Sequence, residues 1–149
     1  MAFYYLETSA LVKLYVREPG TDRMLSLASR SNLNRLAILS LSQVELWSAI
    51  RRRQKNGEIS QIVATQLLET FKRHSETKFI TQIVSDSLLD MAMMLVDRYW
   101  LRAYDAIQLA GYLALKNSAG SDVPFFVCSD KALLSAAIQE GVPIVDPCL

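Results

Sequence analysis

The chain has 149 residues, of which 51% are hydrophobic and 21% charged, so it can bury a core and is not disordered. Its 16 Lys and Arg against 15 Asp and Glu leave a net charge of +1, which argues against a strongly basic protein that coats duplexes. A local basic patch is enough to attract phosphates, so a nucleic-acid partner stays open.

Short apolar runs alternate along the chain with segments of helical periodicity. In chain order they predict a strand at 3–6, helices at 10–15 and 21–30, a strand at 36–41, helices at 42–54 and 60–74, an edge strand at 79–84, helices at 85–99 and 103–116, a strand at 124–128, a helix at 130–140 and a strand at 142–145. Strands separated by helices predict an α/β three-layer sandwich, with a central, mostly parallel sheet between helices. We expect residues 1–149 to form one domain.

Polar residues at three predicted helix starts are interpreted as caps. Thr8 or Ser9 is expected to cap the first helix, and Ser129 the last. Ser42 and Glu45 have the spacing of an S-x-x-E capping box. On this interpretation Glu45 is only the structural partner of Ser42.

Four acidic residues lie close to the carboxyl ends of strands or at helix starts: Glu7, Glu45, Asp105 and Asp130. Ligands bind at this edge in open parallel sheets, so we expect the four carboxylates to converge. Asp105 and Asp130 can also be first-turn acids that complement a helix dipole. Glu7 is harder to explain in this way, because an acid directly after a buried strand needs a partner.

Converging carboxylates repel one another, and a hard divalent cation relieves that repulsion. The single histidine, His74, excludes a multi-histidine zinc site, and all-oxygen ligation favours Mg²⁺ or Mn²⁺. A metal held by carboxylates can polarise a phosphoryl oxygen and activate water, as in metal-dependent nucleases.

A basic run follows Glu45 on the same predicted helix and consists of Arg51, Arg52, Arg53 and Lys55. Beside an acidic pocket it can steer a phosphate backbone toward the metal. The alternative interpretation is a solvated helix end whose positive charge complements the dipole.

Four segments resemble the PIN domain family in the order in which that family has them. Segment 5–15, YLETSALVKLY, resembles its opening, and segment 42–46, SQVEL, its second acidic segment. Segment 101–110, LRAYDAIQLA, is close to its L-R-x-x-D-A-I-H-L-A helix, and 128–134 with 141–147 is similar to its ending. The resemblance covers most of the chain and implies a PIN-like fold.

Small PIN proteins are typically VapC-type toxins of toxin–antitoxin pairs, so the resemblance implies an RNA-cleaving enzyme that depends on Mg²⁺ or Mn²⁺. Carried over to this sequence, the metal-binding and catalytic residues are Glu7, Glu45, Asp105 and Asp130, and Ser9 supports them through hydrogen bonds. It also implies single-stranded or structured RNA as substrate, a small antitoxin as partner and a homodimer. A cytoplasmic location is expected because Cys128 and Cys148 suit reduced thiols and residues 1–7 lack the basic segment of a signal peptide. No apolar run reaches the length of a membrane span.

Two positions depart from the family pattern. Gln108 stands where His is common, and it can donate and accept hydrogen bonds but cannot carry a proton. Glu7 stands where the family nearly always has Asp. The alternative prediction is therefore a weakened PIN domain that binds RNA or a protein partner without efficient cleavage.

A nucleotide-binding or phosphatase domain is disfavoured, because the sequence has neither a G-x-G-x-x-G nor a P-loop spacing. A dimer surface is expected from apolar residues in the first half of the chain, although each can equally belong to the core: Leu11, Leu14, Tyr15, Trp47 and Ile50.

Overall fold

The computed structural model describes residues 2–29 and 33–149, and within them five strands pair in parallel in the order β3-β2-β1-β4-β5. The strands are β1 (Phe3–Leu6), β2 (Arg35–Leu39), β3 (Phe79–Gln82), β4 (Phe125–Val127) and β5 (Ile144–Val145). The predicted parallel sheet is confirmed, and β3 lies at one edge, as expected.

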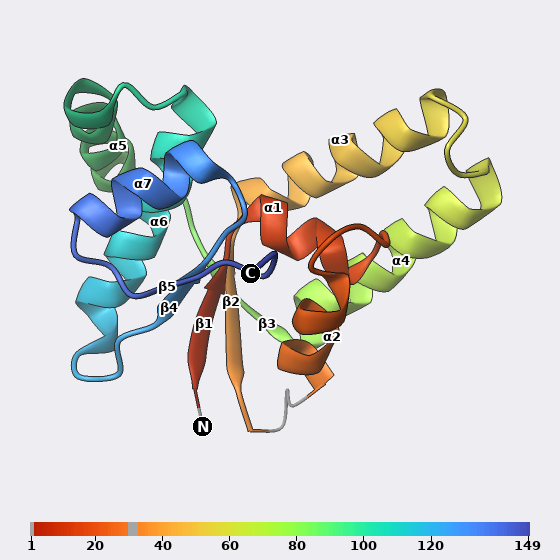
Figure 1. Cartoon of the computed structure of the whole chain (residues 1–149), viewed down its shortest axis with the longest axis horizontal. Coiled ribbons are helices and arrows are strands. Elements are labelled where there is room, and N and C mark those ends of the chain that lie inside the picture. The colour runs from red at the N-terminus through yellow and green to blue at the C-terminus, as the bar shows by residue number, and fades with distance from the viewer. Residues whose placement is uncertain (1, 30–32) are drawn as a thin grey trace.

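Helices cover both faces of this sheet. They are α1 (Thr8–Leu11), the 3₁₀ turn η1 (Val12–Leu14), α2 (Thr21–Ser29), α3 (Leu41–Lys55), α4 (Gln61–Thr77), α5 (Asp86–Tyr99), α6 (Ala103–Ala119) and α7 (Lys131–Gln139). Figure 1 shows α1 to α4 on one side of the sheet and α5 to α7 on the other, with α3 and α4 reaching beyond it as a pair. The three-layer α/β sandwich is thus confirmed.

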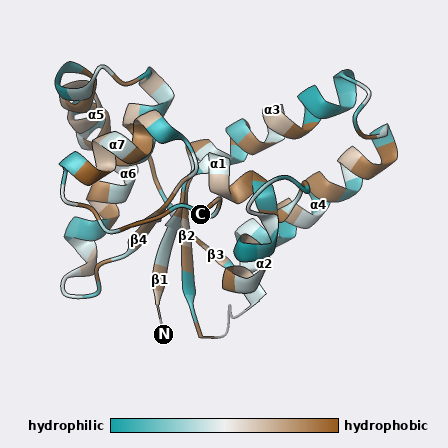
Figure 2. Cartoon of the chain, viewed as in Figure 1, coloured by the Kyte–Doolittle hydropathy of each residue, from teal (hydrophilic) through white to brown (hydrophobic). Residues whose placement is uncertain are grey.

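The sheet divides the core into two apolar clusters because successive side chains of a strand point to opposite faces. In β1, Phe3 and Tyr5 pack in the cluster under α5 to α7, whereas Leu6 packs in the cluster under α1 to α4. Figure 2 shows hydrophobic residues on the strands and the hydrophilic outer end of α3. Burial on both faces explains why the strands are continuous apolar runs.

The predicted caps are wrong at three helices. Glu7 caps α1, because its carboxylate accepts from the backbone N–H of Ser9. Asp130 caps α7 through the N–H of Leu133, in place of Ser129. Ser42 lies inside α3 and is fully buried, so it does not form a capping box with Glu45.

Several predicted boundaries shift by a few residues. The second strand ends at Leu39, two residues early, because α3 already begins at Leu41. The third ends at Gln82, and the first predicted helix divides into α1 and η1. The predicted end of the second helix at Arg30 lies outside the described residues. No helix within residues 2–29 and 33–149 combines the length and apolarity needed to cross a bilayer.

Gly111 allows α6 to approach the sheet closely. A Cβ at this position would lie 2.7 Å from the Tyr5 hydroxyl and 2.8 Å from Leu39 Cδ1, both of them buried. Overpacking costs about 1–3 kcal/mol, and the better helix propensity of alanine offsets about 1 kcal/mol of that cost. We expect Gly111→Ala to lower the free energy of unfolding by up to about 2 kcal/mol in urea titrations.

A second variant tests the cause of that loss. Leu39→Val removes both Cδ atoms next to Gly111, so Gly111→Ala should cost less in this background than in the wild type. An equal cost in both backgrounds would show that contact with Leu39 is not the cause.

Candidate functional site

The carboxyl edge of the sheet brings together residues from distant parts of the chain. Glu7 follows β1, and its backbone N–H donates to the Val127 carbonyl at the end of β4 at 2.9 Å. Asp130 follows the end of β4 by three residues, at the start of α7. Glu45 lies in α3 and Asp105 in the first turn of α6, so four elements contribute one predicted acidic residue each.

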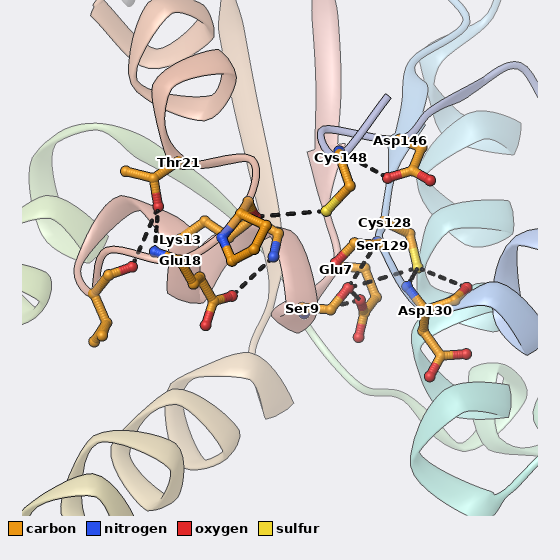
Figure 3. A network of polar contacts seen from close by, with 12 residues as sticks. Glu7, Ser9, Lys13, Glu18, Thr21, Cys128, Ser129, Asp130, Asp146 and Cys148 are labelled. Carbon is orange, nitrogen blue, oxygen red and sulfur yellow. Dashed lines mark hydrogen bonds and ion pairs between the residues drawn. The ribbon is translucent and has the colours of Figure 1, made fainter. Parts of the chain in front are cut away.

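Glu7 is buried, with 5% of its surface exposed, and its carboxylate turns back onto the first turn of α1. Oε2 accepts from the backbone N–H of Ser9 at 2.9 Å and from the Ser9 hydroxyl. Ser9 Oγ also accepts from the backbone N–H of Ser129 at 2.9 Å. Figure 3 shows Ser9 linked by dashed lines to Glu7 and to the turn of Cys128 and Ser129 that leads to Asp130.

Glu45 accepts hydrogen bonds from side chains of two other elements, α1 and α6. Its Oε1 accepts from Thr8 Oγ1 at 2.8 Å and from Gln108 Nε2 at 2.7 Å. Gln108 Nε2 also lies 2.9 Å from Ser42 Oγ, and its Oε1 accepts from the Tyr5 hydroxyl at 2.9 Å. Gln108 is fully buried, so its amide fixes Glu45 relative to β1 and α6.

Asp105 and Asp130 line a hollow of about 280 Å³ together with Trp100 and Arg102. Partial burial raises the pKa of Asp105, and repulsion from Asp130 and Glu45 raises it further, while Arg102 opposes the shift. The Oδ1 atom of Asp130 also accepts from the backbone N–H of Leu133 and so caps α7.

Electrostatic repulsion links all four acids. Burial raises the pKa of Glu7 to about 7, with a smaller contribution from Glu45 and opposing hydrogen bonds from Ser9. Glu45 and Asp130 in turn raise the pKa of Asp105. Among residues 2–29 and 33–149, however, no three His, Cys, Asp or Glu side chains are gathered closely enough to hold a metal ion. Three of the acids instead make hydrogen bonds within the chain: Glu7 with Ser9, Glu45 with Gln108, and Asp130 with the backbone N–H of Leu133.

The donor chemistry of this edge fits a hard divalent cation. The four groups offer oxygen atoms, and their charges disfavour one another in a partly desolvated setting. The one cysteine nearby, Cys128, is buried, and burial raises the pKa of its thiol well above the ordinary value. A protonated thiol is neither a good metal ligand nor a nucleophile, so neither covalent catalysis nor soft-metal binding is favoured here.

The raised pKa of Glu7 predicts a pH dependence of stability in the metal-free protein. Between the ordinary pKa of 4.5 and about 7 the folded chain binds a proton that the unfolded chain has released. Stability therefore falls as pH rises through this window, by about 3 kcal/mol at most. Urea titrations in EDTA should show this decline from pH 5 to 8 in the wild type and a flatter profile in Glu7→Gln. Identical slopes would contradict the raised pKa.

The basic run divides into residues near the acids and residues far from them. Arg52 is seven residues from Glu45, about two turns along α3, and lines a hollow of about 320 Å³ with Glu45, Thr8 and Tyr104. Arg53 instead pairs with Glu18 at 2.6 Å and with Glu58 at 3.4 Å. Arg51 donates to Gln54, and Lys55 is the last residue of α3, at its hydrophilic outer end in Figure 2. The geometry thus places Arg52, of the four, beside the acidic edge.

The apolar residues expected at a dimer surface mostly belong to the core. Leu11 and Ile50 are fully buried in the cluster under α1 to α4, and Leu14 and Tyr15 pack against it. Trp47 is 43% exposed and is the one of the five that reaches the surface substantially. The core interpretation is therefore correct for Leu11 and Ile50 but not for Trp47, and the dimer stays a prediction.

Two residues of this edge were assigned the wrong role from sequence. Thr8 and Ser42 were interpreted as helix caps, but their hydroxyls lie 3.3 Å apart and contact the amide that holds Glu45. The sequence feature that could indicate this role is their spacing from the acids. Thr8 directly follows Glu7, and Ser42 precedes Glu45 by about one helical turn.

Comparison with known proteins gives one family and several related folds. The model of the PIN domain family matches residues 4–117, more than half of the chain. No curated protein matches the sequence at a significant level.

Three solved structures have similar folds. A toxin–antitoxin complex from Klebsiella pneumoniae is 16% identical, with a TM-score of 0.64 and coverage of 97% of both chains. PAE2754 from Pyrobaculum aerophilum is 24% identical, with a TM-score of 0.59 and coverage of 91% of this chain and 84% of that one. VapBC2 from Rickettsia felis, bound to a DNA fragment from the promoter, is 14% identical, with a TM-score of 0.63 and coverage of 96% of this chain and 97% of that one. At these identities the likenesses show a shared fold.

Proposed function

Because the chain belongs to the PIN domain family, we propose that it is a metal-dependent endoribonuclease of the toxin type, which hydrolyses RNA phosphodiesters with water. PIN domains are generally nucleases, and they usually use divalent metals. The observation that carries the proposal is the placement of Glu7, Glu45, Asp105 and Asp130 at one sheet edge, where repulsion links them.

Glu7, Asp105 and Asp130 would hold Mg²⁺ or Mn²⁺, with Glu45 bound directly or through water. When bound, the cation supplies Lewis-acid polarisation of a phosphoryl oxygen and lowers the pKa of water. The chain itself positions the donors: Ser9 orients Glu7, and Gln108 orients Glu45. Arg52, beside Glu45, attracts the phosphate backbone. Water is the nucleophile in this proposal, since Cys128 is a protonated thiol.

The partners follow from the same proposal. The similar folds from Klebsiella pneumoniae and Rickettsia felis are described as parts of a toxin–antitoxin complex and of VapBC2, which supports a small antitoxin as partner. A homodimer and a cytoplasmic location complete the proposal. RNA as substrate and two unpaired cysteines agree with that location.

A second candidate function is binding of RNA or a protein without efficient cleavage. Two observations favour it: Glu stands at position 7 where the family usually has Asp, and within residues 2–29 and 33–149 no three acidic side chains lie close enough together to hold a metal ion. The two candidates differ in whether the acids can rearrange around a cation.

Metal removal tests the proposed function. The full chain is incubated with a pool of single-stranded RNA in Mn²⁺, in Mg²⁺ and in EDTA, and cleavage is followed under single-turnover conditions. We expect slow cleavage that requires Mn²⁺ or Mg²⁺ and stops in EDTA. Cleavage that persists in EDTA contradicts the mechanism, whereas binding without cleavage in either metal favours the second candidate.

A further inference from the structure

Two exposed aromatic side chains lie beside the acidic edge. Trp100 is 92% exposed and lines the hollow that contains Asp105, Asp130 and Arg102. Tyr104 is 62% exposed and lines the hollow that contains Glu45 and Arg52. Each hollow therefore combines an exposed aromatic ring, one arginine and at least one carboxylate, and Tyr99 also lines the hollow that contains Trp100.

Trp100 occupies a costly position. It ends α5 with φ 59° and ψ 33°, a left-handed conformation that glycine or asparagine adopts far more readily than a bulky residue. Among residues 2–29 and 33–149 it is the one non-glycine residue with positive φ. Its indole is almost entirely in water, so burial does not offset this strain. Strained residues that pack against nothing are concentrated at functional sites.

We infer that Trp100 and Tyr104 are base-stacking residues that make the site specific for single-stranded RNA. In this arrangement the nucleotides on either side of the scissile phosphate stack on the two rings, and Arg102 and Arg52 contact the flanking phosphates. The phosphodiester between them then lies at Asp105 and Glu45. The inference rests on the proposed function, because it names the substrate class of the same site.

The residues of the two hollows favour single-stranded RNA over duplex RNA. Bases of a duplex already stack on their neighbours, so they have no free face for an aromatic ring, whereas unpaired bases have one. Arg52 and Arg102 form no ion pair with the described residues 2–29 and 33–149 and are therefore free to meet phosphates. Guanidinium groups next to rings favour nucleic acid over an apolar protein surface as the occupant.

Binding measured in EDTA tests this inference separately from cleavage. A labelled, unstructured twelve-nucleotide RNA and a matched RNA duplex are titrated with the full chain and followed by fluorescence anisotropy. Stacking on one ring corresponds to about tenfold in affinity. We expect Trp100→Ala and Tyr104→Ala each to weaken single-strand binding about tenfold and to leave duplex binding nearly unchanged. Trp100→Phe and Tyr104→Phe retain a ring and should remain close to wild type.

Two controls separate stacking from structural effects. Trp100→Gly removes both the ring and the strain, so it should raise the urea midpoint while it weakens RNA binding. Met93→Ala truncates another exposed apolar side chain of the same helix, α5, and should not change binding. In Trp47→Phe, Trp100 is the remaining tryptophan, and single-stranded RNA but not duplex should quench its fluorescence.

Three other outcomes of these experiments would decide between the inference and its alternatives. Unchanged single-strand binding in both alanine variants, or equal losses for duplex and single strand, would overturn the inference. Unchanged RNA binding together with lost self-association in light scattering would overturn it in favour of an interface between copies. Ring-dependent binding in EDTA without cleavage in any metal would uphold the stacking inference and reject the nuclease proposal.

Discussion

Replacing Asp105 by asparagine is expected to slow single-turnover RNA cleavage by on the order of a hundredfold or more. The negative charges of both Asp130 and Glu45 raise the pKa of Asp105. Asp105 is therefore the acid best placed to share a cation with its neighbours. Loss of one ligand removes several kcal/mol of transition-state stabilisation, of which each 1.4 kcal/mol is about tenfold in rate. Removing a negative charge from a repelling cluster should leave the urea midpoint unchanged or raise it.

The matched control is Asp97→Asn, which makes the same chemical change at an exposed site on α5. Its cleavage rate should equal that of the wild type. Both rates are to be measured in the wild-type and the Glu7→Asp backgrounds, so that slow parent activity does not hide the effect. Equal cleavage by Asp105→Asn and Asp97→Asn would remove Asp105 from the site.

Replacing Glu7 by aspartate is expected to accelerate cleavage, by about a hundredfold if the carboxylate now lies about 1 Å from its productive position. The Glu7 side chain is long enough to turn back onto Ser9, and this contact engages its carboxylate in capping α1. Aspartate is the better capping residue and is one methylene shorter, so its carboxylate should face the other acids while α1 stays capped. Mg²⁺ demands near-ideal octahedral geometry, and the gain should be largest with this metal.

The measurement is single-turnover cleavage of the same RNA pool by both chains at matched Mg²⁺ and Mn²⁺. Glu7→Gln serves as the control, because it keeps the length of the side chain and loses the charge, and it should be slower than the wild type. If Glu7→Asp is no faster than the wild type with either metal, glutamate is an adequate ligand and the weakened-site alternative loses its basis.

The sequence was sufficient for the architecture because its signals are local and repeated. Apolar runs of strand length that alternate with helical segments predict the parallel sheet, which the structure confirms. The predicted caps are wrong for a physical reason. A polar side chain that follows a strand end can cap the next helix or form a hydrogen bond with a residue far away in the sequence. Thr8 contacts Gln108, which is 100 residues away, and no local pattern records such a contact.

The contacts between the residues of the candidate site could not be predicted from the sequence. Sequence position placed Glu45 near the edge, yet only the fold shows that Gln108 holds it and that Arg53 belongs to an ion pair with Glu18. The sequence does not indicate a role for Trp100, because its left-handed backbone depends on the conformation of the chain between α5 and α6. Such features depend on tertiary packing, which overrides residue preference.

Calorimetric titration with Mn²⁺ tests most directly whether this acidic edge is a divalent-metal site, since it does not depend on knowing the RNA. The wild type and Asp105→Asn are compared at pH 8, where Glu7, with its pKa of about 7, is mostly ionised. We expect the wild type to bind Mn²⁺ and Asp105→Asn to bind it at least about tenfold more weakly, a difference of about 1.4 kcal/mol. Equal binding by the two proteins, or no binding by the wild type, would contradict the metal site proposed for this edge.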